Sequence, residues 1–358
     1  MNSPFFKVFL SCLLLWLCSR LILLGTALGL HAWMHSSIPL PSLFGILDST
    51  WYLSIVTEGY DVVPRAFTHH ANYVFFPLFP LLIKLCSIIC HLSPLIAGYI
   101  VSNGCFLGAL ILFRQWLAAH FDVKTVQTAT WLLAFSPYNV YFMAIYTESL
   151  ALLLMLACWI AAEKRAWKAA ATAGFLLALS HPNGVLMLFP LLWFVYDEWE
   201  QGGAWKQAWP ILCIPLGLLV YMAYLYVHTG DALAFAHNMR AWHRPGWSWA
   251  DFVPEVMAHA EGQAYNLMMY FIGIGFSFFL WRRGYAKEAM IMPLFTVMAL
   301  GSGSFVSLAR YTATLFPFYL AYALLVQGSL YRWGFVVLNY IGFGILSLYW
   351  FLESPQIY

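Results

Sequence analysis

The sequence predicts an all-α polytopic membrane protein with about ten to twelve transmembrane helices. Of its 358 residues, 63% are hydrophobic and only 9% are charged, whereas soluble domains carry about a quarter charged residues. The mean hydropathy is +0.75. Aromatic residues make up 19% of the chain, and the tryptophans and tyrosines among them favour the membrane–water interface. A chain this apolar has too little polar surface to face water, so lipid has to be its solvent.

Charge and cysteine usage exclude several other classes of protein. The net charge of +2 is too small to indicate nucleic-acid binding or a polybasic patch for lipid headgroups. The seven cysteines lie in apolar runs, at spacings that fit neither a zinc ribbon nor a disulfide framework. We therefore expect membrane lipids, and no nucleic acid, among the partners.

Apolar runs define the candidate spans. The first, at about residues 8–30, is long enough to cross the hydrocarbon and lacks a convincing cleavage site, so it is interpreted as a retained helix. The others lie at about 73–90, 95–113, 126–143, 148–162, 168–180, 185–196, 208–228, 263–281, 288–303, 309–327 and 333–352. Several are short, and these are interpreted as re-entrant or broken helices inside the bundle.

The whole chain, 1–358, is predicted to be a single integral membrane domain with two long loops, at about 31–72 and 229–262. Both loops are polar enough to carry helices that lie in the membrane interface. The basic clusters at 163–168 and 282–287 predict a cytoplasmic side, which places both long loops outside. Between residues 72 and 146, the number of candidate spans differs by one from the number that these sides of the membrane require. One segment there therefore has to be re-entrant or split.

Asp48 is the first candidate functional residue. It precedes an aromatic-rich helix in the first external loop. One interpretation is a helix N-cap, in which the carboxylate accepts hydrogen bonds from free backbone amides. The other is a general base that accepts the proton of a substrate hydroxyl, a role that contributes roughly 10²–10⁴-fold to a rate. The two roles are not exclusive.

Other polar residues lie near span ends on the same predicted side. Glu148 opens an apolar helix, where it either complements the positive helix N-terminus or, with Tyr146, hydrogen-bonds sugar hydroxyls. Arg310 stands at the head of a span without an obvious acid nearby, which predicts an anion beside it, either a lipid headgroup or a substrate phosphate. The residues from His181 to Gly184 form either a plain turn or part of a site.

The two long loops add weaker signals. Arg65, His69, His70 and Asn72 fit either a metal or phosphate site or a solvated loop, and a solvated loop is the simpler interpretation. In the second loop, an interfacial amphipathic helix explains residues 240–245 without any chemistry.

In combination these motifs resemble the PIG-V family, the glycosylphosphatidylinositol mannosyltransferase II group with its bacterial relatives, within the GT-C glycosyltransferases. The resemblance rests on Asp48-x-x-Trp51-Tyr52-Leu53 with Gly59-Tyr60, Phe75-Phe76-Pro77-Leu78-Phe79-Pro80, Tyr146-Thr147-Glu148-Ser149, Asn183-Gly184, Gly230-Asp231 to Trp242, and Arg310-Tyr311 followed by Phe316-Pro317. Each motif is weak alone, but their number and order are specific. Two departures stand out: Leu47 replaces a frequent Trp before Asp48, and His181-Pro182 replaces an Arg-Ser pair. The second departure removes a fixed cation and leaves Arg310, with Arg65 or His181, to supply positive charge.

The resemblance implies a GT-C fold and an inverting transfer of mannose from a polyprenyl- or dolichyl-phosphate-mannose donor. The acceptor is then a hydroxyl of a lipid- or glycan-linked molecule at the external membrane face, with Asp48 as the general base and neither a metal nor another cofactor. The residues predicted to bind substrate are Tyr52, Arg65, His69, Tyr146, Glu148, His181, Asn183 and Arg310. The short chain favours a bacterial homologue in the inner membrane, with its site facing the periplasm and with a partner subunit.

Two other functions are weighed beside the transferase. A sugar or lipid transporter, or a flippase, accounts for the short spans, although the polar residues gather at one face and no inverted repeat is apparent. A non-catalytic scaffold that binds a partner subunit is the third hypothesis.

Overall fold

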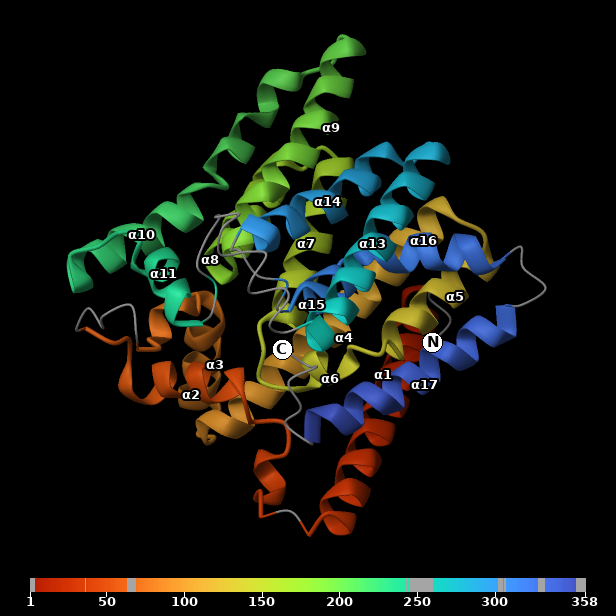
Figure 1. Ribbon diagram of the computed structural model, residues 1–358. Coiled ribbons are helices and arrows are strands. Elements are labelled where there is room, and N and C mark those ends of the chain that lie inside the picture. Colours follow the sequence, from red (N-terminus) through yellow and green to blue (C-terminus); the bar gives the residue numbers. More distant parts are fainter. Residues whose placement is uncertain are drawn as a thin grey trace.

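The computed structural model describes residues 4–35, 37–62, 69–242, 244, 260–301, 305, 307–327 and 332–351. In these residues the chain forms helices and turns without a strand (Figure 1). The prediction of an all-α protein is therefore confirmed.

Four helical stretches are long and apolar enough to cross a membrane, judged by length and composition. They are Phe6–Trp33, Pro94–His120, Trp205–Thr229 and Ala264–Arg282. Three shorter apolar helices are Leu78–Cys90, Phe316–Gln327 and Val337–Trp350. Several of the other apolar runs, among them 73–90, 126–143 and 309–327, are divided into helices that are each too short to cross about 30 Å of hydrocarbon.

The four long stretches correspond to α1 (Pro4–Trp33), α4 (Pro94–His120), the 3₁₀ helix η4 (Trp205–Cys213) with α10 (Leu216–Thr229), and α13 (Ala260–Arg282). The other α-helices are α2 (Asp48–Glu58), α3 (Leu78–Cys90), α5 (Val123–Ala134), α6 (Asn139–Met143), α7 (Glu148–Glu163), α8 (Trp167–Ser180), α9 (Leu188–Glu200), α11 (Ala234–His237), α14 (Ala286–Gly301), α15 (Leu308–Ala313), α16 (Phe316–Gln327) and α17 (Arg332–Phe351). Short 3₁₀ helices are η1 (Leu40–Ser42), η2 (Asn72–Val74), η3 (Pro182–Met187) and η5 (Asn238–Trp242).

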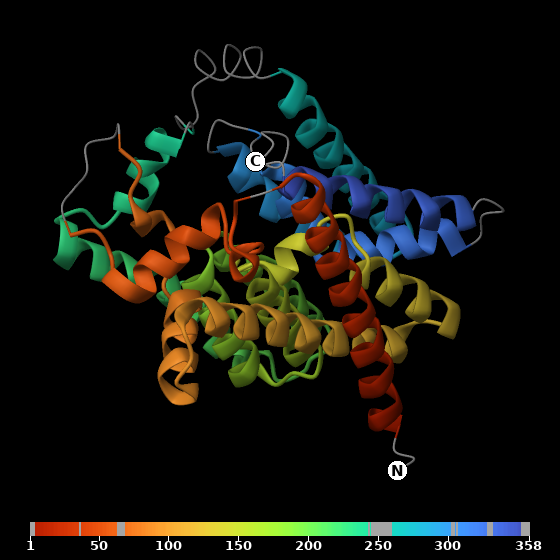
Figure 2. The ribbon, with the colours of Figure 1, turned by 90° about the horizontal axis from the view of Figure 1, so that it is seen from below.

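Both long loops carry short helices, and the two loops contact each other. The first contains η1, α2 and η2, and the described part of the second contains α11 and η5. Asn238 of the second loop donates its side-chain amide to the His69 carbonyl (3.0 Å) and accepts from the Ala71 backbone N–H (3.1 Å). Figures 1 and 2 both show α2 and α3 beside α10 and α11. This contact brings the second loop to the side of the molecule on which α2 begins.

The apolar run at 126–143, in the region where the count of spans was uncertain by one, is divided. It ends as α5 at Ala134 and resumes as α6 at Asn139. The twelve residues of α5 rise only about 18 Å, too little to cross a bilayer. Polar groups freed by the break find partners on other segments, as apolar surroundings require: Asn339 donates to the Phe135 carbonyl (2.6 Å) and Tyr319 to the Ser136 hydroxyl (2.7 Å).

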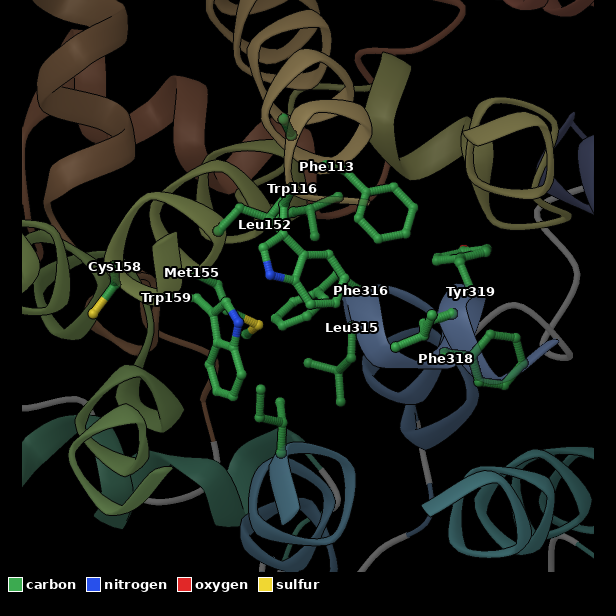
Figure 3. Packing of buried hydrophobic residues seen from close by; sticks show 14 of the residues in the cluster. Phe113, Trp116, Leu152, Met155, Cys158, Trp159, Leu315, Phe316, Phe318 and Tyr319 are labelled. Atoms are coloured by element: carbon green, nitrogen blue, oxygen red, sulfur yellow. The ribbon is translucent and has the colours of Figure 1, made fainter. Parts of the chain in front are cut away.

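The largest cluster of buried side chains holds α4, α7 and α16 together (Figure 3). Trp159 of α7 and Phe316 of α16 are fully buried with ring centroids 5.6 Å apart. The Phe316 ring also meets Trp116 of α4 edge to face at 5.2 Å. Close packing of large rings fixes these helices relative to one another. As a result, the first residue of α7 and the short helix α15 that precedes α16 lie close together.

Gly184 lies where η3 packs closely against α8. A Cβ atom there would lie 2.5 Å from the Leu177 carbonyl carbon and oxygen, which are backbone atoms and cannot rotate away. We expect Gly184→Ala to destabilise the protein by about 1–3 kcal/mol through overpacking. Gly104→Ala, where a Cβ meets nothing within 4 Å, is the control. Thermal unfolding in detergent measures both variants, and equal melting temperatures would contradict the packing described.

Candidate functional site

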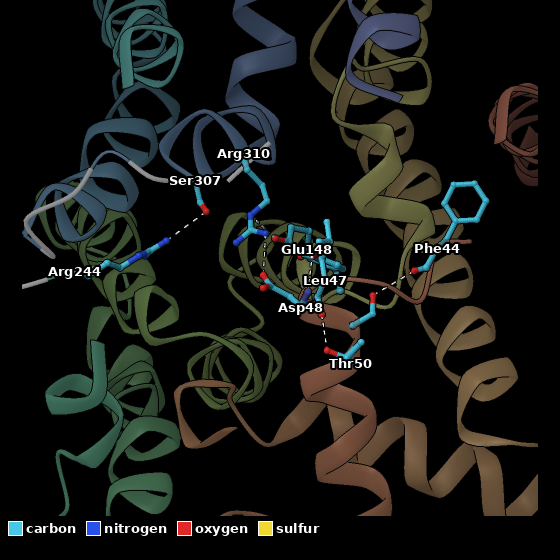
Figure 4. A network of polar contacts seen from close by, with 10 residues as sticks. Phe44, Leu47, Asp48, Thr50, Glu148, Arg244, Ser307 and Arg310 are labelled. Carbon is cyan, nitrogen blue, oxygen red and sulfur yellow. Dashed lines mark hydrogen bonds and ion pairs between the residues drawn. The ribbon is translucent and has the colours of Figure 1, made fainter. Parts of the chain in front are cut away.

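A buried arginine bridges two carboxylates from distant parts of the chain (Figure 4). Arg310 of α15 places Nη1 3.1 Å from Oδ2 of Asp48, the first residue of α2. Its Nε lies 3.2 Å from Oε1 of Glu148, the first residue of α7, as an ion pair without a directed hydrogen bond. The three side chains are 10%, 20% and 7% exposed, respectively. We call these three residues, together with Tyr146, the Arg310 cluster.

The neighbours of Arg310 correct one expectation from the sequence. No acid stands near it in the chain, and the sequence therefore predicted a lipid headgroup or a substrate phosphate as its anion. The structure supplies Asp48 and Glu148 instead. Removing charges from water costs several kcal/mol per ion, and close opposite charges offset that cost. Since two carboxylates face one guanidinium, these three residues have a formal charge of −1, so Arg310 is not a free cation.

Asp48 is not the N-cap of α2, so that interpretation of the sequence is wrong. The N-cap is Leu47, without a side-chain capping hydrogen bond, and the Asp48 carboxylate points to Arg310 instead. The Asp48 backbone N–H donates to the Tyr146 hydroxyl at 3.1 Å. Leu47 has φ 61° and ψ −130°, a conformation that costs a non-glycine residue about 1–3 kcal/mol and persists only where the surroundings enforce it. Strain is thus stored beside the Asp48 carboxylate.

Aromatic rings surround the Arg310 guanidinium. Its Cζ atom lies 5.2 Å from the Tyr141 ring centroid, 5.4 Å from that of Tyr146 and 5.3 Å from that of Tyr311. Cation–π attraction at such distances stabilises a guanidinium, and an apolar wall strengthens the electrostatic interactions inside it. Tyr141 and Tyr311 are site residues that the sequence prediction missed. The available signal for Tyr311 was its place beside Arg310 in a motif.

Glu148 has an open acceptor. Its Oε2 atom is buried and has no hydrogen-bond partner among the described residues. Leaving a buried polar atom unsatisfied costs about 1–3 kcal/mol, so such an atom is well suited to a hydrogen-bond donor on a bound molecule. Because the rest of the carboxylate is held by Arg310, the direction of this acceptor is fixed before anything binds.

A second arginine reaches the same region from the second long loop. Arg244 donates from Nη2 to the Ser307 hydroxyl at 3.3 Å (Figure 4), and its Cζ lies 6.0 Å from the Tyr311 ring centroid. The His181 ring meets the same tyrosine edge to face at 5.6 Å. The sequence assigned residues 240–245 to an interfacial helix without chemistry, and the structure places Arg244 beside the site instead. Only tertiary contact shows this, because nothing in the loop sequence points to Ser307.

Two predicted site residues, Asn183 and His69, have contacts away from Arg310, and a third, Arg65, is not described. Asn183 is buried and donates to the Phe295 carbonyl at 2.9 Å, which ties η3 to α14. His69 is exposed, and its carbonyl belongs to the contact between the two loops. Arg65 lies outside the described residues. The described contacts of Asn183 and His69 do not include Arg310.

Tyr52 is buried in α2 against Phe75 and Phe79, each with a ring centroid 5.0 Å away. Burial, with the negative charges of Glu148 and Asp48, raises the pKa of its hydroxyl above the ordinary value. Tyr52 is therefore a neutral phenol near the carboxylates and can donate a hydrogen bond.

His181 caps η3: its Nδ1 accepts from the Asn183 backbone N–H at 3.2 Å. Burial, with the positive charges of Arg310 and Arg244, lowers the pKa of His181 to about 4, against about 6.5 in an unfolded chain. The unfolded state therefore binds more protons as the pH falls below about 6.5, and stability is lost down to about pH 4.

We expect the melting temperature to fall between pH 6.5 and pH 4, and to fall less steeply in His181→Asn, which lacks this group. Melting curves of both proteins across this range, recorded in one detergent, measure the difference. If the melting temperature falls equally steeply with pH in both proteins, the lowered pKa of His181 is contradicted.

No group of three or more His, Cys, Asp or Glu side chains that could hold a metal ion is found within the described ranges. That the protein works without a cofactor stays a prediction from the sequence.

Comparison by sequence finds no relative: no family model and no curated protein matches the chain. The resemblance to the PIG-V family therefore stays a prediction. Solved structures do show a likeness. The oligosaccharyltransferase of Archaeoglobus fulgidus, crystallised with zinc and sulfate, is 16% identical over 86% of this chain and 48% of its own, with a TM-score of 0.48. Its apo form is 13% identical over 96% and 55%, also with a TM-score of 0.48.

A third solved structure, the oligosaccharyltransferase AglB of the same organism, holds an inhibitory peptide and a dolichol-phosphate. It is 14% identical over 86% of this chain and 51% of its own, with a TM-score of 0.44. The chain thus spans about half the length of the solved structures it matches. At these identities and TM-scores the likeness says nothing about the activity of this chain.

Proposed function

We propose that this chain is a membrane glycosyltransferase that uses a lipid-phosphate-linked sugar, and that the Arg310 cluster is its catalytic site. The observation that carries the proposal is the bridge from Arg310 to Asp48 and Glu148. A buried, charged cluster assembled from the starts of three separate helices is costly to maintain, and such clusters mark functional sites in membrane proteins by default.

In the proposed reaction, Asp48 is the general base. Arg310 holds its Oδ2 atom, so Oδ1 is the oxygen available to accept the proton of an acceptor hydroxyl. The acceptor oxygen attacks the anomeric carbon of the sugar while the bond to the lipid phosphate breaks. The phosphate leaves with the bonding electrons as an anion, and a direct displacement of this kind inverts the anomeric centre.

Glu148 and Tyr146 suit recognition of sugar hydroxyls. The open Oε2 atom of Glu148 accepts from a hydroxyl, and a site built to hydrogen-bond a hydroxyl discriminates strongly against analogues that lack it. The resemblance to the PIG-V family favours mannose as the sugar and a polyprenyl or dolichyl phosphate as its carrier. The same resemblance favours a bacterial inner membrane, a periplasmic site and a partner subunit.

The leaving phosphate requires a cation, and Arg244 is the candidate that reaches the Arg310 cluster from the second long loop. Arg310 is already paired with two carboxylates, and Arg244 donates to the hydroxyl of Ser307, three residues before Arg310. We expect Arg244→Gln to raise the donor KM about 10–100-fold, as the loss of a charged hydrogen bond worth about 1.5–3 kcal/mol implies. Initial rates against donor concentration measure this.

Arg240→Gln, in the same loop, is the matched control and is expected to keep the donor KM of the wild type. If Arg244→Gln and Arg240→Gln have equal donor KM values, Arg244 does not bind the donor phosphate.

The proposed activity is tested with purified protein in liposomes, supplied with polyprenyl-phosphate-[³H]mannose and an alkyl mannoside as acceptor. We expect radioactivity to move from the donor to the acceptor. Movement of the labelled lipid between leaflets without transfer would favour a flippase, and neither event would favour a scaffold. Both of these outcomes overturn the proposal.

A further inference from the structure

A second buried arginine lies in α1, away from the Arg310 cluster. Arg20 is 7% exposed, near the middle of a stretch that is long and apolar enough to cross a membrane. Its Nη1 donates to the Asn103 side-chain oxygen (3.2 Å) and its Nη2 to that of Asn139. Its Nε donates to the Ser19 hydroxyl (3.3 Å), and its Cζ lies 4.7 Å from the Phe106 ring centroid. Among the described residues, its hydrogen-bond partners are all neutral.

A guanidinium with neutral partners in an apolar bundle needs a source of negative potential, and the end of α5 supplies one. Asn139 accepts from Arg20 with its side-chain oxygen and donates with its side-chain nitrogen to the carbonyl of Ala134, the last residue of α5. Carbonyls at a helix C-terminus carry partial negative charge and stabilise a cation. Arg20 is therefore connected through Asn139 to the break between α5 and α6.

The same hydrogen bonds hold both ends of α6. At its start, Asn139 is bound by Arg20. At its end, the Met143 carbonyl accepts from the side-chain nitrogen of Asn103, at 3.2 Å, and the Asn103 side-chain oxygen is itself held by Arg20. Trp16 adds a hydrogen bond from its indole N–H to the Asn103 carbonyl (3.1 Å). A five-residue helix has little stability of its own, so these side chains fix its position.

The segment held in this way forms one wall of the Arg310 cluster. Tyr141, in the middle of α6, has its ring 5.2 Å from the Arg310 guanidinium. Tyr146, three residues after the end of α6, accepts from the Asp48 backbone N–H, and Glu148 follows two residues later. A shift of α6 therefore moves a ring beside Arg310, a hydrogen-bond partner of Asp48 and one carboxylate together.

We infer that Arg20, with Asn103 and Asn139, is a positioning network for the catalytic site. Arg20 touches no member of the Arg310 cluster through its described hydrogen bonds, and acts by fixing α6. The inference rests on the proposed function for its effect on turnover. Its effect on the geometry of the site does not depend on which reaction the site performs.

The test is Arg20→Lys, which keeps the positive charge and loses the fork of donors that reaches Ser19, Asn103 and Asn139 at once. We expect kcat to fall about 100-fold, as for reacting groups misplaced by about 1 Å, with donor KM within about threefold of the wild type. Asn103→Ala, which removes no charge, is also expected to lower kcat with little change in the donor KM. Arg114→Lys is the matched control, since Arg114 is half-buried in α4 and about 16 Å along that helix from Asn103.

Backbone hydrogen exchange, followed by mass spectrometry in detergent, provides a measurement that needs no activity. In Arg20→Lys and Asn103→Ala, we expect faster exchange in residues 44–50, which contain the Asp48 amide, and in residues 141–148, with α3 and α10 unchanged. Exchange in both segments equal to the wild type, or faster by the same factor throughout the molecule, would overturn the inference. If the wild type transfers no sugar, the proposed function fails while this measurement still decides the role of Arg20.

Discussion

Replacing Asp48 by asparagine is expected to lower sugar transfer roughly 10²–10⁴-fold, the contribution of a general base. Asparagine keeps the shape of the side chain and leaves the backbone N–H that donates to Tyr146, but its amide cannot accept a proton at neutral pH. Arg310 keeps its ion pair with Glu148. The loss should therefore fall on kcat, measured as initial rates in liposomes at saturating donor.

Asp231→Asn is the matched control for this change. Asp231 also lies in a predicted external loop, where it pairs with His237 at 2.6 Å and touches no member of the Arg310 cluster among its described contacts. It should turn over like the wild type. Near wild-type turnover in a folded Asp48→Asn variant would defeat the role of Asp48 as the base.

Replacing Arg310 by methionine is expected to destabilise the protein by about 3–5 kcal/mol, because removing one partner of a buried ion pair leaves its other members uncompensated. Here two carboxylates, one of them only 7% exposed, lose their counterion together. The measurement is unfolding by heat or denaturant in one detergent.

A double variant separates charge from packing. Glu148→Gln added to Arg310→Met removes the more buried of the two uncompensated charges. We expect it to recover part of the lost stability, so the two substitutions should be non-additive, and it should remain inactive. Additive destabilisation would show that the two side chains do not interact in the folded protein.

The sequence predicted the helical class correctly because composition alone decides it, but it could not locate the helix breaks. The apolar run at 126–143 looks continuous, yet α5 ends at Ala134. Pro137 marks the break, but the groups that make it tolerable in apolar surroundings include Asn339, far away in the sequence. Hydropathy therefore identifies this apolar run but not the point at which its helix ends.

The site was predictable in part. Asp48, Tyr146, Glu148 and Arg310 stood out as polar residues in apolar surroundings, and the structure brings all four together. Their mutual contacts did not follow from the sequence, since the start of a helix suits a capping carboxylate as well as a free one. The carboxylate of Asp48 pairs with Arg310, 262 residues away, and does not cap α2.

Arg20 and Arg244 show two other limits of prediction from the sequence. A single arginine within an apolar run gives no hint of its partners, and Arg20 is explained only when Asn103 and Asn139 are seen beside it. A basic residue in a tryptophan-rich loop is typical of the membrane interface, and the sequence does not show that Arg244 contacts Ser307, three residues before Arg310. Both residues depend on tertiary contacts that no local pattern encodes.

The role proposed for Asp48, Glu148 and Arg310 is to hold a lipid-linked sugar in place for attack by an acceptor hydroxyl that Asp48 deprotonates. It is tested most directly by an experimental structure of the protein with a non-hydrolysable analogue of polyprenyl-phosphate-mannose. We expect a sugar hydroxyl within hydrogen-bond distance of Glu148 Oε2, the phosphate on the side of Arg244, and the anomeric carbon open to attack from the Asp48 side. A sugar phosphate bound elsewhere, with the Arg310 bridge unchanged and empty of ligand, would contradict it.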